Sequence, residues 1–78
     1  MIKEHQSVVL TTDLANEGLT AGDIGTVVHI HKGGRAYEVE FMTLLGKTVT
    51  VTTLDHAQVR PVFDGEVAHA RLLSARSA

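Results

Sequence analysis

The chain has 78 residues, with seven Lys and Arg, nine Asp and Glu, and a formal net charge of −2. A chain of this length forms one domain that buries about 60% of the surface its unfolded form exposes. The absence of cysteine excludes a disulfide framework and thiolate chemistry. No segment resembles a signal peptide or is apolar over a length that spans a membrane, so we expect a cytoplasmic protein.

The first half of the chain predicts two strands joined by a long polar loop. Residues 7–12 form the first strand, residues 13–18 form the loop, and Gly22 and Asp23 close it. The acidic residues of this region are expected to satisfy turn amides. Alternation over residues 24–31 predicts the second strand and two opposite faces: Ile24, Thr26, Val28 and Ile30 on one, and Gly25, Val27, His29 and His31 on the other.

The second half predicts two hairpins and a short last strand. Paired glycines over residues 32–35 accept the positive φ angles of a tight turn, and Tyr37, Val39 and Phe41 then share one face of the returning strand. A turn over residues 44–46 leads to a strand over 48–53, whose Val49 and Val51 are expected to point inward. One 3₁₀ turn follows, with Asp55 as its cap. Residues 58–62 form the last strand, in which Pro61 suits an edge position.

Five short strands with these connections indicate an all-β fold, a small five-stranded SH3-like barrel over residues 1–62. Residues 63–78 predict a short C-terminal helical extension, because Asp64 suits a helix cap and the apolar residues that follow recur at helical spacing. These are Phe63, Val67, Ala70 and Leu73.

An ordered set of motifs resembles one known family. The motifs are Val8-x-Leu10, Gly22-Asp23-x-Gly25-Thr26-Val27-Val28, Tyr37-Glu38-Val39-Glu40-Phe41, Gly46-Lys47-Thr48 and Leu54-Asp55-x-Ala57-Gln58-Val59-Arg60-Pro61. Over residues 4–62 they look like the small bacterial family called domain of unknown function 4926. The resemblance implies an SH3-like barrel and carries no established activity, so it assigns no functional residue.

One departure from the family pattern supplies the main functional hypothesis. The family usually has a short polar turn after the Glu-Val-Glu-Phe strand, whereas this chain has Met42, Thr43, Leu44 and Leu45. The apolar tip either packs over an open barrel end, with Leu44 as the plug, or is exposed as a contact surface. We expect a non-enzymatic module that binds itself as a homodimer or binds a protein from a neighbouring gene. Its interaction residues are Met42, Leu44 and Leu45 at the tip, with Val67, Leu72 and Leu73 on the tail.

Two alternatives remain open. Lys32, Arg35 and Lys47 flank turns and would carry nucleic-acid binding if they gathered at one end of the barrel, although the acidic net charge makes this the weaker hypothesis. His29 and His31 share the outer face, and counting from the glycine turn pairs His29 with Glu38. These three residues form a possible metal site in an accessory protein, against the default of a solvated polar face. No pattern predicts a catalytic group or a cofactor.

Overall fold

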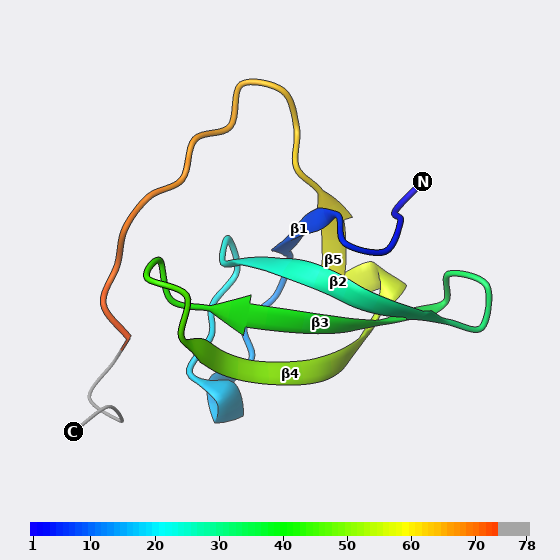
Figure 1. The fold of residues 1–78 in the computed structure, drawn as a ribbon, viewed down its shortest axis with the longest axis horizontal. Coiled ribbons are helices and arrows are strands. Elements are labelled where there is room, and N and C mark those ends of the chain that lie inside the picture. The colour runs from blue at the N-terminus through cyan, green and yellow to red at the C-terminus, as the bar shows by residue number, and fades with distance from the viewer. Residues whose placement is uncertain (74–78) are drawn as a thin grey trace.

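The computed structural model describes residues 1–73 and confirms the predicted all-β class (Figure 1). Its five strands form one antiparallel sheet in the order β4-β3-β2-β1-β5. The strands are β1 (Ser7–Leu10), β2 (Ile24–His31), β3 (Ala36–Met42), β4 (Thr48–Asp55) and β5 (Val59–Pro61), and two 3₁₀ turns, η1 (Ala15–Glu17) and η2 (His56–Gln58), lie between them. Each strand falls within two residues of its predicted bounds.

Local sequence explains most of this register. The turn after β2 pairs His29 with Glu38, as counting from the paired glycines predicted. The predicted 3₁₀ turn forms as η2, whose first turn is closed by a hydrogen bond from the Asp55 N–H to the Gln58 side chain at 2.8 Å. The inward face of β3 is also confirmed, because Tyr37, Val39 and Phe41 are all buried.

Two β-bulges change the faces of the strands from those that simple alternation predicted. The first lies between Val27 and His29, where Val28 has no partner on β3. It lets both Val27 and Ile30 contact the core, although the sequence had placed them on opposite faces. A second irregularity opposite Phe41 lets Val49 pack against the core and leaves Val51 47% exposed, so the inward position predicted for Val51 is wrong.

The core lies where β2 crosses β3, and Gly25 permits the close approach of the two strands. A Cβ atom at Gly25 would lie 2.6 Å from Val39 Cγ1 and 2.9 Å from Phe41 Cε1. Around this crossing the buried side chains come from all five strands and the first loop. They are Val8, Leu10, Leu19, Val27, Tyr37, Val39, Phe41, Leu54 and Val59.

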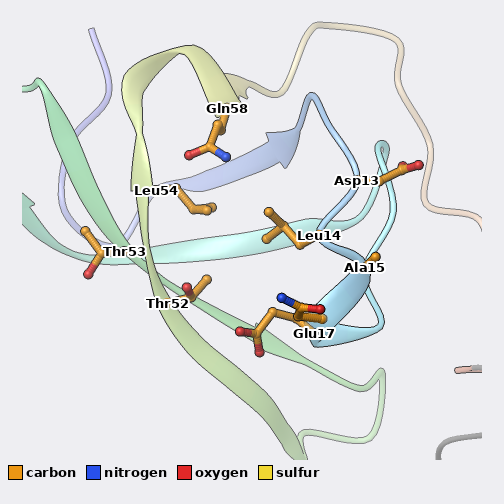
Figure 2. A pocket seen from close by; sticks show the side chains of 9 residues that line it. Asp13, Leu14, Ala15, Glu17, Thr52, Thr53, Leu54 and Gln58 are labelled. Carbon is orange, nitrogen blue, oxygen red and sulfur yellow. The ribbon is translucent and has the colours of Figure 1, made fainter.

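The predicted closed barrel is wrong in one respect, because the sheet is open between β4 and β5 within the described residues. The turn η2 directs the chain away from β4, so that β5 pairs with β1 instead. A backbone hydrogen bond from the Thr11 N–H to the Gln58 carbonyl, 2.8 Å long, holds that corner. The gap beside β4 is narrowed by side chains: Leu14 of the first loop and Leu54 of β4 point toward one another (Figure 2).

The predicted C-terminal helix is wrong over residues 63–73, which contain one turn at Asp64 and Gly65 and otherwise run without helix or strand. Gly65 has a φ of +89°, outside the helical region. The Glu66 carboxylate, which a helix would leave on its surface, instead binds Arg60 on β5. Residues 74–78 of the predicted helix lie outside the described residues.

Candidate functional site

The apolar tip lies on the turn between β3 and β4, and the turn is well hydrogen-bonded. The Thr43 N–H donates to the Lys47 carbonyl at 2.8 Å, and the Lys47 N–H donates to Thr43 Oγ1 at 3.0 Å. These bonds hold the backbone, while Leu44 is 81% and Leu45 100% exposed. The alternative in which Leu44 plugs the end of the barrel is therefore wrong. The tip presents two leucines to solvent on an ordered hairpin.

The other predicted interaction residues lie at different depths. Met42, at the end of β3, is about half exposed, and Val67 and Leu72 on the tail are almost fully exposed. Leu73 is partly buried. The tail and the β3–β4 turn both lie toward the same end of the long axis of the molecule (Figure 1). The structure thus brings the tip and the tail to one end of the molecule.

Two arginine contacts hold the tail on the sheet. Arg60 donates both terminal nitrogens to the Glu66 carboxylate, at 2.9 and 2.7 Å, and its guanidinium lies 4.3 Å from the centre of the Phe63 ring. The Phe63 N–H donates to the same carboxylate at 2.6 Å. The hydrogen bonds from Arg60 and from the Phe63 N–H lower the pKa of Glu66 to about 2.

The second contact joins the end of the tail to the start of β2. Arg71 Nε donates to Asp23 Oδ1 at 2.9 Å, and Arg71 Nη2 bonds the second oxygen of the same carboxylate. Asp23 also accepts from the Thr20 N–H at 2.9 Å, as its predicted turn role requires. Partial burial acts to raise the pKa of Asp23, but the Arg71 and Thr20 hydrogen bonds outweigh it and lower the pKa below its ordinary value. Sequence reasoning missed both arginine contacts. Arg71 lies 48 positions from Asp23, and Arg60 binds Glu66, six positions along the chain, where the sequence had predicted a helix.

The histidine pair lies on the outer face of β2, as predicted, but its nitrogens have separate partners. His31 Nε2 lies 3.1 Å from Glu38 Oε1, whereas His29 Nδ1 lies 3.5 Å from Glu4. Hydrogen bonds from His31 and Thr53 lower the pKa of Glu38. Over residues 1–73, no group of three or more histidine or acidic side chains is arranged to hold a metal ion. The predicted trio of His29, His31 and Glu38 therefore does not act as one group, because His31 contacts Glu38 whereas His29 contacts Glu4.

The basic residues of the nucleic-acid alternative do not gather. Lys32 and Arg35 lie in the turn before β3, and Lys47 lies in the turn after it. Successive hairpin turns fall at opposite ends of a strand, so the seven residues of β3 separate these charges by about 20 Å. The two turns lie at opposite ends of the long axis (Figure 1).

An open groove of about 370 Å³ lies between the first loop and β4, and sequence reasoning did not find it (Figure 2). Leu14 and Leu54 line it, with the Gln58 side chain at one end and Glu17 of η1 at the other. Asp13 at its margin accepts from the Ala21 N–H at 2.9 Å, which confirms a turn role for that carboxylate. The groove thus lies where η1 and the residues before it face β4.

Similarity to a known family adds to this geometry. Residues 4–61 match the family model described as "Domain of unknown function (DUF4926)". The chain belongs to this family. Neither the curated proteins nor the solved structures gave a match to the chain. Within the residues that the structure describes, no helix has the length and apolar character needed to cross a membrane.

Proposed function

We propose that this member of the family is a non-enzymatic protein-interaction module, acting in the cytoplasm, that binds through the apolar tip of the β3–β4 hairpin. The observation that carries the proposal is the exposure of two adjacent leucines, Leu44 at 81% and Leu45 at 100%, on a hydrogen-bonded turn. A side chain such as Leu44 contributes roughly 1.5–3 kcal/mol when it is transferred from water to an apolar contact, so its exposure leaves that free energy for a partner.

The fold supports the same proposal. We assign it to the SH3-like class because β1 to β4 follow one another in the sheet and β5 returns to β1 after a 3₁₀ turn. A sheet of this size encloses little volume, and the groove between the first loop and β4 is open to solvent. Such a scaffold is suited to presenting loops to a partner rather than to enclosing a substrate.

The double variant Leu44→Asp with Leu45→Asp, called the tip variant below, tests the proposal. Both side chains lie in solvent, so we expect the free energy of unfolding to change by less than about 0.5 kcal/mol and the β-rich circular dichroism to persist. We expect association to be lost, both self-association in light scattering and retention of a protein partner on immobilised chain. A matched tail variant with Val67→Asp and Leu72→Asp places the same charges on the tail and measures its share of the binding.

The result that would contradict the proposal is a tip variant that associates as the unmodified chain does. If only the tail variant loses association, the interaction surface lies on the tail. To separate the loss of apolar contact from the effect of the added charges, both assays are repeated in high salt. An apolar contact persists there, whereas contacts between exposed charges are screened.

A further inference from the structure

Val9 is a buried side chain that does not belong to the hydrophobic core. Its exposed fraction is 6%, yet it lies outside the cluster of side chains that forms the core. On β1 it pairs with Ile24 of β2 on one side and with Arg60 of β5 on the other, so these three side chains share the outer face of the sheet. The burial of Val9 therefore comes from groups that lie on this outer face.

The C-terminal tail forms one wall of a small cleft beside Val9. The cleft has a volume of about 120 Å³, and Val67 and Ala68 line it from the tail. Val9 and Ile24 line it from the sheet, and Val62 lines it where the tail begins. Figure 1 shows the tail leaving β5 and running as an arc outside the sheet. A segment without helix or strand is thus placed opposite an apolar part of the outer face.

The root of the tail, residues 63–66, is firmly attached to β5. The Glu66 carboxylate accepts two hydrogen bonds from Arg60 and one from the Phe63 N–H. The Arg60 guanidinium also lies over the Phe63 ring. Because these contacts join residues close together in the chain, the root stays in place whatever the rest of the tail does.

The arm of the tail, residues 67–73, is attached in a different way. Residues 67–70 are exposed, and none of them makes a hydrogen bond within the part of the chain that the structure describes. The arm meets the sheet again at Arg71, which donates Nε to Asp23 Oδ1 at 2.9 Å and Nη2 to the other oxygen of that carboxylate. Arg71 Nη2 also lies 3.3 Å from the Gly18 carbonyl. The contacts of one side chain therefore keep the arm closed.

We propose that the arm is a hinged cover for the cleft, closed by the contact between Arg71 and Asp23 and opening as a unit beyond Glu66. A partly exposed ion pair contributes little stability, so the closed arm exchanges with an open arm of comparable free energy. Opening gives solvent access to Val9 and Ile24. The chain thus carries a second apolar surface, separate from the tip, that the arm conceals and uncovers. This device goes beyond the proposed function and does not depend on it.

The reactivity of a single thiol measures how often the cleft is open. The chain has no cysteine, so Val9→Cys places one thiol at the covered position, and its reaction with iodoacetamide, an uncharged reagent, is followed by mass spectrometry. We expect Arg71→Ala to raise the reaction rate about two- to fivefold, which is the change in open-to-closed ratio that loss of such an ion pair produces. Arg71→Lys keeps the charge but loses the paired hydrogen bonds, so its rate should be intermediate. Ile24→Cys repeats the measurement from the neighbouring strand.

Two reference thiols separate opening of the arm from unfolding and from full exposure. Val27→Cys lies in the core, where only unfolding exposes it, so its rate should be far lower and should rise steeply with low concentrations of urea. Leu45→Cys is fully exposed and sets the upper limit of the rate. Val9→Cys should react between these limits and depend little on urea, because the arm opens without unfolding of the sheet.

Three results would overturn the inference. If Val9→Cys reacts as slowly as Val27→Cys, the position becomes accessible only on unfolding and the arm does not open. If it reacts as fast as Leu45→Cys, the arm does not cover it. If Arg71→Ala leaves the rate unchanged, Arg71 is not the latch. Arg35→Ala, which removes the same type of side chain at the other end of the molecule, should leave every rate unchanged.

Discussion

The two edges of the sheet differ in how they are protected. β5 has three residues, ends at Pro61, and continues into a tail that Arg60 and Arg71 hold against the sheet. β4 has eight residues, no proline, and backbone groups that alternate toward solvent. Short length and proline are usual means of preventing strand addition, and both occur at the β5 edge. Within the described residues, one edge of the sheet is thus a short strand that ends in proline and the other is a longer strand without these features.

The largest effect should come from removing the core contact of each edge strand. Leu54 on β4 is 2% exposed, and Leu54→Ala should lower the free energy of unfolding by about 2–5 kcal/mol. Val59→Ala on β5 should cost less, about 1.6 kcal/mol from its two lost methyl groups plus a cavity term. Urea unfolding followed by circular dichroism measures both. A larger loss for Val59→Ala would show that β5, and not β4, is the better anchored edge.

A smaller effect should appear where the tail meets β2. Arg71→Ala removes both hydrogen bonds to Asp23, and because the pair is partly exposed the loss should be about 0.2–1 kcal/mol. The clearer readout is mobility. The flexibility of residues 66–72, measured by NMR relaxation of their backbone amides, should rise to the level typical of a free chain end. Arg35→Ala removes the same side chain at the opposite end of the molecule and should leave the tail unchanged. Unaltered relaxation in Arg71→Ala would mean that other contacts hold the tail.

The smallest effect is a pH dependence located at the β5 edge. The pKa of Glu66 is lowered from 4.5 to about 2 in the folded chain, so the Arg60 contact stabilises the fold above pH 4.5 and this stabilisation is lost as the pH falls toward 2. In Glu66→Gln this pH-dependent stabilisation should be absent. The free energies of unfolding of the variant and of the unmodified chain should therefore become equal below about pH 2. Arg60→Gln should remove the same stabilisation. To test this, the free energy of unfolding of all three proteins is measured from neutral pH into the acid range. If the three curves of free energy against pH run parallel, the Arg60–Glu66 contact is not a source of stability.

Local chemistry was sufficient to predict the strands and turns. The paired glycines of the β2–β3 turn determined the pairing of His29 with Glu38, because a tight turn sets the register of the residues beside it. The same reasoning predicted the 3₁₀ turn at Asp55 and the buried face of β3. For the candidate site, the sequence indicated that the tip residues were out of place for a polar turn, but it left their exposure undecided.

Residue order alone was therefore enough to establish the all-β class, the succession of elements and membership of the family, whereas the remaining features required the folded chain. The bulge at Val28 and the close approach of β2 and β3 at Gly25 are features that no alternation pattern records. The position of the tail involves Asp23, far away in the chain, which binds Arg71. The free edge of β4 depends on the pairing of β5 with β1 rather than with β4. Each of these features is set by contacts between residues distant in sequence, and such contacts form only once the sheet has folded.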